Sequence, residues 1–192
     1  MTDQIPRFRL SQSPPSLRPA TAVDQPVLLQ IFTESHCADL MVLGLDATAL
    51  AGLVGMQYRA RHGQYRSGNP GAVEYLITDG GGSPIGSCWL DDTPGRLRVL
   101  DIAVLAEHRR RGVARAVLGS LCEQAAAQGR PVRLSVWHQN LPALELYRSL
   151  GFGTVPDGAG GADDGDPADL GNGYLELQWV PDRAPRPRAG AR

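Results

Sequence analysis

Residues 99–118, VLDIAVLAEHRRRGVARAVL, carry the strongest structural signal in the chain. The apolar residues up to Leu105 predict a β-strand, and the residues after Gly112 predict an α-helix that a short turn joins to the strand. The first N–H groups of a helix lack acceptors within it, and the helix dipole adds positive charge there. Gly112 lets a ligand approach the backbone, and Ala114 keeps the next turn small. This junction therefore predicts an anion site that suits a phosphate or pyrophosphate.

Arginine side chains surround this predicted anion site. They are Arg109, Arg110, Arg111 and Arg115. The site is neither a P-loop nor a dinucleotide fingerprint, because the patterns GxxxxGK[ST] and GxGxxG are absent from the sequence. An exposed basic turn or a nucleic-acid patch is the alternative interpretation of these arginines. Their position directly before the start of a helix favours phosphate binding.

Strand and helix patterns alternate on both sides of this stretch. Strands are predicted at 17–20, 73–78, 84–90, 96–105, 132–137 and 174–180. Helices are predicted after the capping box of Thr21 and Asp24, after the N-cap Asp46, and over 113–128 and 141–150. The alternation in the second half is typical of βαβ units, so the chain is predicted to be a single α/β or α+β domain.

This domain is expected to cover residues 17–180. Residues 1–16 and 181–192 contain several prolines and no apolar period, so both are expected to be disordered tails. Within the domain, residues 156–173 contain six Gly, five Asp and no basic residue. That composition predicts a mobile acidic loop between two strands.

The overall composition excludes several classes of protein. The 192 residues include 19 basic residues, all of them Arg, and 20 acidic ones, and a formal charge of −1 excludes a globally basic nucleic-acid binder. No apolar run approaches the roughly 18 residues of a membrane span, and no secretory signal is recognisable. We therefore expect a cytoplasmic protein that binds neither nucleic acid nor membrane. Cys37, Cys88 and Cys122 are expected to be reduced and buried, and no metal site is expected.

Two motifs resemble those of a known enzyme family. The first, Arg109-x-x-Gly112-x-Ala114, resembles the acyl-CoA-binding motif Arg/Gln-x-x-Gly-x-Gly/Ala. The second, NLPALELYRSLGF at 140–152, resembles the signature Asn-x-x-Ala-x-x-Leu-Tyr-x-x-x-Gly-Phe. The first motif alone is a weak pattern, but the two together at this spacing are specific to one family. Over residues 17–180, and most strongly from 96 to 155, the sequence is similar to the GNAT family of N-acetyltransferases.

The resemblance implies a single-domain acyl-CoA N-acyltransferase fold, in which helices flank a mixed central sheet that is splayed at the cofactor site. Acetyl-CoA would lie in the opening, where the backbone of Ile102, Ala103 and Val104 would pair with the pantetheine arm and polarise the thioester carbonyl. The residues implied at the pyrophosphate are Arg109, Arg110, Arg111, Gly112, Val113, Ala114 and Arg115. Asn140 would bind the cofactor arm, and Tyr147 would be the general acid for the departing thiolate.

The same resemblance implies an N-acetyltransferase reaction. A primary amine of a small molecule or protein would attack the thioester of acetyl-CoA directly in a ternary complex. The alternative is a catalytically degenerate CoA-binding module with a regulatory or scaffolding role. Acetyl-CoA and an amine acceptor are the expected partners, and a homodimer is left open. If the acidic loop 156–173 borders the acceptor, its charge would favour a cationic amine.

The general base is predicted to be Asp101, the acid on the strand before the phosphate turn. Strict alternation places Asp101 on the face of Leu97 and Val99. A β-bulge would move it to the face of Arg98, where relatives often carry their base. A buried structural role for Asp101 is the alternative, and the further candidates for the base are Glu34, His36, His62, Tyr65 and His138.

Overall fold

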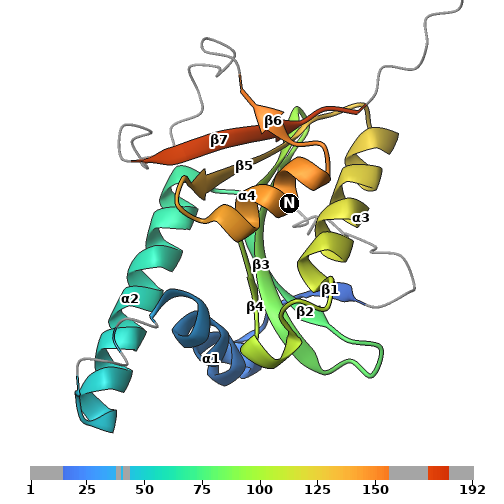
Figure 1. Ribbon diagram of the computed structural model, residues 1–192. Helices are drawn as coiled ribbons and strands as arrows, with labels where there is room; N and C mark the ends of the chain where they lie inside the picture. The colour runs from blue at the N-terminus through green and yellow to red at the C-terminus, as the bar shows by residue number, and fades with distance from the viewer. Residues whose placement is uncertain (1–14, 38–39, 41–43, 156–172, 182–192) are drawn as a thin grey trace, which may run out of the picture.

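The computed structural model describes residues 15–37, 40, 44–155 and 173–181 (Figure 1). The strands are β1 (Ser16–Pro19), β2 (Ala72–Thr78), β3 (Pro84–Thr93), β4 (Arg96–Val104), β5 (Val132–Trp137), β6 (Gly153–Thr154) and β7 (Tyr174–Trp179). The α-helices are α1 (Gln25–His36), α2 (Ala47–Gly68), α3 (Val113–Ala127) and α4 (Leu141–Ser149), and the 3-10 turns η1 and η3 cover Ala22–Asp24 and Ala106–His108. Every predicted helix and strand is present with ends shifted by a few residues, whereas the short strand β6 was not predicted.

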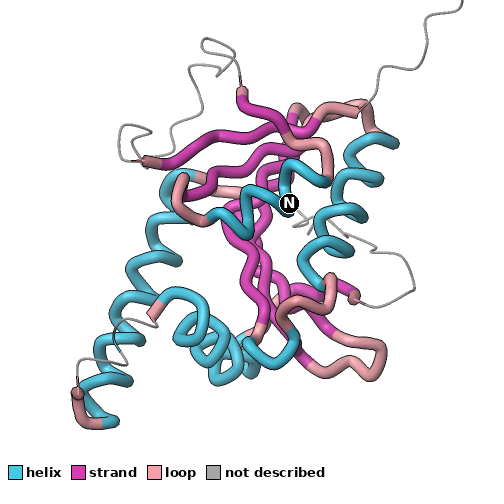
Figure 2. The backbone as a smooth tube through the Cα atoms, viewed as in Figure 1, coloured by secondary structure: helices cyan, strands magenta, loops and turns pink. Residues whose placement is uncertain are grey.

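The strands form one mixed sheet in the order β1-β2-β3-β4-β5-β7-β6. Neighbouring strands are antiparallel except β4 and β5, which run parallel. These two pair only over Leu97–Val99, opposite Val132–Leu134, and then diverge (Figure 2). The predicted mixed sheet with a splayed pair of strands is therefore confirmed.

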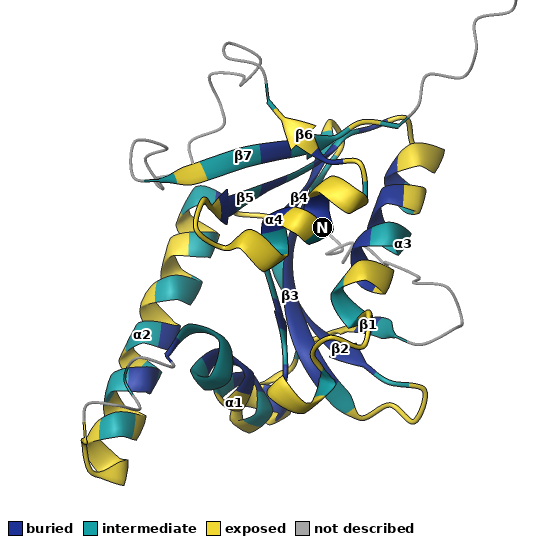
Figure 3. Ribbon diagram, viewed as in Figure 1, coloured by how far each residue is buried: buried dark blue, intermediate teal, exposed yellow. Residues whose placement is uncertain are grey.

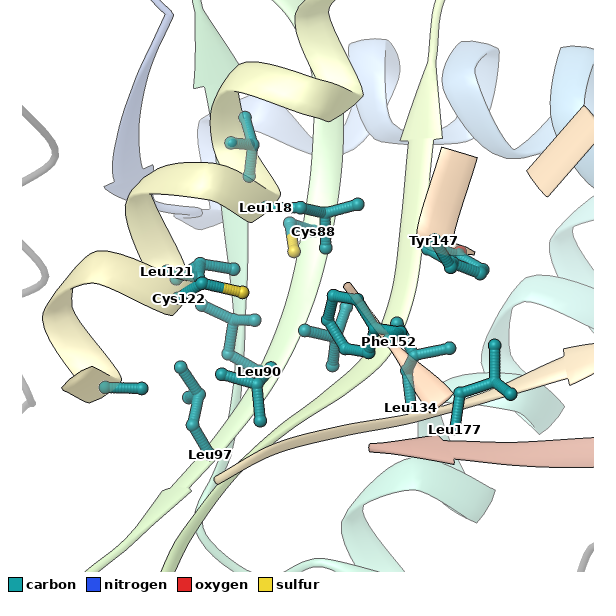
Figure 4. Packing of buried hydrophobic residues seen from close by; sticks show 14 of the residues in the cluster. Cys88, Leu90, Leu97, Leu118, Leu121, Cys122, Leu134, Tyr147, Phe152 and Leu177 are labelled. Carbon is teal, nitrogen blue, oxygen red and sulfur yellow. The ribbon is translucent and has the colours of Figure 1, made fainter. Parts of the chain in front are cut away.

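Helices cover both faces of this sheet (Figure 3). Each face has its own hydrophobic cluster. Side chains of α3 and α4 pack with the central strands on one face, where Cys88 and Cys122 lie among leucines (Figure 4). On the other face, α1 and α2 pack against Leu76 of β2 and Ala103 of β4. The cleft where β4 and β5 part therefore opens between two well-packed layers.

Polar side chains fix the start of the 3-10 turn η1, which leads into α1, and the start of α2, at the two positions that the sequence predicted. Asp46 accepts hydrogen bonds from the N–H groups of Thr48 and Ala49, both at 2.9 Å. Asp24 accepts from the backbone N–H of Thr21 at 2.8 Å and pairs with Arg18 of β1 at 2.7 Å. The Arg18 hydrogen bond, followed by those from Thr21, lowers the pKa of Asp24 far below its usual range.

A β-bulge interrupts β4 at the point that matters most for function. Trp89 of β3 pairs with Asp101, but the next residue, Leu90, pairs with Val99, so Leu100 is the extra residue. Before the bulge, Leu97 and Val99 face the α3 layer; after it, Asp101 faces the α1 and α2 layer. The expectation from strict alternation is wrong for Asp101, and the bulge is the physical reason.

Parts of the prediction fall outside the described residues: the tail segments 1–14 and 182–192 and the acidic loop 156–172. Ser16 pairs with Thr78, so the first strand begins one residue before the expected boundary. Cys37, Cys88 and Cys122 are free and buried, as predicted. In the described ranges, no helix is long and apolar enough to cross a membrane.

Candidate active site

A cavity of about 800 Å³ opens where β4 and β5 part. Its walls include Val99–Val104 of β4 and Leu134–Trp137 of β5, together with side chains from α1, α2 and α4. On the β3 side, β4 remains paired along the cavity except at the bulge residue Leu100, whereas on the β5 side its pairing ends at Val99. The β4 backbone on that side can therefore pair with an extended ligand.

A second pocket of about 530 Å³ lies over the start of α3. Gly112, Val113 and Ala114 line it, with α4 as the opposite wall. Val104 and Arg109 line both this pocket and the larger cavity, so the two form one cleft. The motif residues and the parted strands are thus brought together, as the sequence predicted.

The backbone before α3 adopts an unusual conformation beside the second pocket. Arg110 has φ 60° and Gly112 has φ 81°, both in the left-handed region. For Arg110 this conformation costs of order 1 kcal/mol, and such outliers concentrate at ligand-binding sites. No atom lies within 4 Å of where a Cβ on Gly112 would be, so the space above it is open to a ligand. Successive N–H groups in such a turn form an anion-binding concavity.

Two of the predicted arginines are already engaged by protein groups. Arg109 donates through Nε to the Val104 carbonyl oxygen at 2.8 Å and through Nη2 to the Glu34 carbonyl oxygen at 3.0 Å. Arg109 therefore links the turn before α3 to α1. Arg115 donates to Ser149 Oγ of α4 at 2.8 Å, across the second pocket. Arg110 and Arg111 are exposed.

Asn140 and Tyr147 both line the larger cavity. The Oδ1 atom of Asn140 accepts a hydrogen bond from Ala143 N–H at 3.2 Å, so Asn140 is also the N-cap of α4. Tyr147 is 8% exposed. Burial first, and then the charges of Asp101 and Cys88, raise its pKa to about 12. Its hydroxyl is therefore protonated at neutral pH and can act as a donor.

Asp101 lies in the same cavity and is held by His36 at the end of α1. His36 Nε2 is 2.9 Å from Asp101 Oδ2. Burial alone would raise the pKa of Asp101, but the hydrogen bond and charge of His36, together with the charge of Arg61, lower it overall. Asp101 is therefore a carboxylate at neutral pH. A carboxylate can only accept, so Nε2 must be the donor of this pair.

The other predicted base candidates lie elsewhere or have structural partners. Glu34 accepts from Ala106 N–H at 2.8 Å, outside the cavity lining. His62 lies 3.5 Å from Glu74 and against Trp89, and it does not line the larger cavity. His138 contacts the Gly173 carbonyl oxygen at 2.7 Å through Nδ1. Only His36 and Tyr65 from that group share the cavity with Asp101.

Arg98 occupies the face that the bulge gives to Asp101, but it is a buried structural residue. Its Nη2 donates to Ser135 Oγ at 3.3 Å, and its Nη1 lies 3.8 Å from Glu176. These contacts link β4 to Ser135 of β5 and Glu176 of β7, at the point where β4 and β5 part. Arg98 therefore braces the closed end of the cleft.

Among the cavity residues that sequence reasoning did not single out are Arg61 of α2 and Tyr174 of β7. The only available signal for Arg61 was its i, i+4 spacing to Tyr65, which places both side chains on one helix face. Nothing local in the sequence singles out Tyr174. Among the described residues, no group of three or more metal-ligating side chains is found.

The sequence match decides the family. A model of the acetyltransferase (GNAT) family matches residues 43–152, which contain both motifs. The chain belongs to the GNAT family. No curated protein matches the sequence well enough to count as a relative.

Solved structures of other acetyltransferases share the fold. They include the ribosomal-protein-S18-alanine N-acetyltransferase from Escherichia coli (TM-score 0.55, 17% identity, covering 88% of this chain and 95% of that one). PaiA N-acetyltransferase from Thermoplasma acidophilum in complex with coenzyme A has TM-score 0.58 and 14% identity, covering 86% and 98%. An acetyltransferase from Thermus thermophilus has TM-score 0.55 and 21% identity, covering 86% and 96%. At these identities the GNAT fold is what is shared.

Proposed function

We propose that this GNAT protein transfers the acetyl group of acetyl-CoA directly to a primary amine within a ternary complex. The observation that carries the proposal is that His36 with Asp101 and the hydroxyl-bearing Tyr147 line one cavity, which continues into the pocket over the start of α3. A proton acceptor and a proton donor thus meet beside one binding cleft. Direct transfer needs both, because the amine must lose a proton and the leaving thiolate must be stabilised.

Binding of the co-substrate is assigned to backbone groups. N–H groups from Arg110 to Arg115 would hold the pyrophosphate, and the free edge of β4 at Ile102–Val104 would pair with the pantetheine arm. Asn140 would add a hydrogen bond to that arm. An N–H of this β4 edge would also stabilise the negative charge that develops on the thioester oxygen.

His36 is proposed as the general base, and Asp101 as the residue that orients it. Because Asp101 accepts from Nε2–H, the lone pair of the neutral ring lies on Nδ1, which can take the proton of the attacking amine. The anionic Asp101 then stabilises the imidazolium that forms. This extends the sequence prediction, in which Asp101 itself was the base.

Tyr147 is proposed to donate to the thiolate as the carbon–sulfur bond breaks. With a pKa of about 12 the phenol is a weaker acid than a thiol of ordinary pKa near 8.5, so complete proton transfer is uphill. The main contribution is therefore a hydrogen bond to charge that exists only late in the reaction. Solvent then protonates the thiolate.

Release of the CoA thiol in the presence of a panel of amines tests this function. The panel should span simple amines, amino acids, polyamines and short peptides. We expect thiol release that depends on both acetyl-CoA and an amine. Acetyl-CoA binding in calorimetry with no release for any amine would support the degenerate CoA-binding module instead.

A further inference from the structure

Arg61 projects from the middle of α2 into the larger cavity, on the side away from the phosphate pocket. Its Nε donates to Tyr65 Oη at 2.8 Å, and its guanidinium carbon lies 5.7 Å from the centre of the Tyr65 ring. These contacts fix the guanidinium against one wall of the cavity. None of the roles proposed above uses Arg61.

The terminal nitrogens of Arg61 remain available to donate hydrogen bonds to a ligand. A guanidinium carries five N–H donors in a planar fork, and only the one on Nε is bonded to a residue in the described part of the chain. Burial alone would lower the pKa of Arg61, but the charge of Asp101 and the Tyr65 hydroxyl raise it overall. A charged fork that lines a cavity is suited to a planar, bidentate anion such as a carboxylate.

Arg61 and Asp101 carry opposite charges but are not in direct contact. Together with His36 they line the part of the cavity that we call the acceptor end. Their electrostatic attraction raises the pKa of Arg61 and lowers that of Asp101. The two groups nonetheless form no ion pair, and Asp101 pairs with His36 instead. If Arg61 served only to balance Asp101, direct pairing would satisfy both groups better. The arrangement suits a molecule that carries an amine and an anion a few bonds apart.

We infer that the acceptor is an amine that also carries a carboxylate, and that Arg61 binds this carboxylate while His36 receives the proton of the amine. The inference rests on the proposed acetyltransferase function and narrows its substrate class to amino acids and their close derivatives. It assigns Arg61 the role of a specificity-determining residue. It also predicts discrimination against amines that lack the negative charge.

Matched acceptor pairs test the inference with the full-length protein. Each L-amino acid is compared with its primary amide in the thiol-release assay, at saturating acetyl-CoA. The amide has the more readily deprotonated amine, which favours it in the chemical step. We nonetheless expect kcat/KM to be about 10- to 100-fold higher for the acid of the preferred pair, because a charge-assisted bidentate hydrogen bond is lost in the amide.

Arg61→Gln isolates the contribution of the guanidinium. The expected effect is a rise of about 10- to 100-fold in KM for the acid, with little change for the amide and a smaller change in kcat. Arg61→Lys, which keeps the charge but not the fork, should restore part of the preference. Arg59→Gln is the matched control, because Arg59 lies on the same helix but faces a different pocket.

The outcomes separate the two proposals. Equal rates for acids and amides, or an Arg61→Gln variant that slows both alike, would overturn the carboxylate assignment while leaving the acetyltransferase function intact. A preference for phosphate-bearing amines over carboxylated ones would also overturn it. If no amine is acetylated, the proposed function fails, and calorimetric titration of the CoA-bound protein with acids and amides then decides the assignment. Acid-selective binding that Arg61→Gln abolishes would support it, and equal or absent binding would contradict it.

Discussion

The two ends of the cleft are built in different ways. The proposed phosphate end comes from one continuous stretch, the turn and first helical turn at 108–115, and its expected donors are mainly backbone N–H groups whose positions depend on φ and ψ. The acceptor end is assembled from side chains of separate elements: His36 of α1, Arg61 of α2 and Asp101 of β4. A backbone site needs one local conformation, whereas a side-chain site needs the whole fold to bring its members together.

This difference determines what a single substitution can do at each end. At the proposed phosphate end several backbone N–H groups would share the ligand, so removal of one side chain would leave these donors in place. At the acceptor end each role rests on one side chain, and Asp101 reaches its position only through the extra residue Leu100. Substitutions at the acceptor end should therefore reduce turnover sharply while acetyl-CoA still binds.

The largest effect is expected for His36→Gln, which removes the proposed proton acceptor. Single-turnover acetylation should slow by about 10²- to 10⁴-fold, the usual contribution of general base catalysis. Asp101→Asn should slow it by a similar order, because it misorients the ring and removes the charge that stabilises the imidazolium. Acetyl-CoA affinity in calorimetry should be unchanged for both variants. His138→Gln is the matched control, and a rate loss there equal to that of His36→Gln would contradict the assignment.

Gly112→Asp should have the next largest effect, this time on binding. A carboxylate at the phosphate turn opposes the ligand charge, and acetyl-CoA affinity should fall by about 100-fold or more. Gly112→Asn is the control of similar shape without charge, and Asn tolerates the left-handed conformation that Gly112 adopts at φ 81°. A much smaller loss for Asn than for Asp would locate the effect in the charge. Unchanged affinity of the Asp variant would remove Gly112 from the phosphate site.

Tyr147→Phe should have a smaller effect that falls on turnover. Loss of one hydrogen bond to the developing thiolate should reduce the single-turnover rate by about 10-fold, while acetyl-CoA affinity changes little. The ring packs against Phe152 with centroids 5.9 Å apart, a contact that phenylalanine retains. A drop in affinity as large as the drop in rate would indicate a binding role instead.

The elements that form the proposed phosphate end could be predicted almost entirely from the sequence. A strand, an arginine-rich turn, Gly112 and a helix follow one another without interruption, so the local pattern contains the whole site. For the same reason, the second motif placed Asn140 at the N-cap of α4 and Tyr147 within that helix. Strand and helix periodicity also indicated the α/β architecture, because most elements bury a single face. The pairing of β6 with β7 could not be predicted, because a two-residue strand has no periodicity.

The acceptor end could not be predicted to the same depth. The bulge at Leu100 reverses the face of Asp101, and nothing in the apolar run from Val99 to Leu105 marks an extra residue. His36 was one of several candidates, and only the structure distinguishes it from Glu34, by its place in the cavity lining and its contact with Asp101. Arg61 lies 40 residues before Asp101 in the chain, and the packing of α2 against the sheet brings the two to one cavity. Such relations depend on tertiary structure and leave no local pattern.

The smallest expected effect concerns the pH dependence of the Tyr147→Phe variant. Tyr147 lies between the two ends of the cleft, and its effect on the rate should hardly change with pH. Its pKa is raised to about 12, so the protonated form persists as pH rises and is lost only near that value. The ratio of wild-type to Tyr147→Phe single-turnover rates should therefore vary by less than about twofold between pH 6 and 10, since about 99% of a group with this pKa is still protonated at pH 10. Titration of the acceptor amine changes both rates alike, so its effect cancels in the ratio. A ratio that falls toward one between pH 8 and 10 would show that Tyr147 ionises in that range and that its hydroxyl lies in a far more polar site than the buried position beside Phe152.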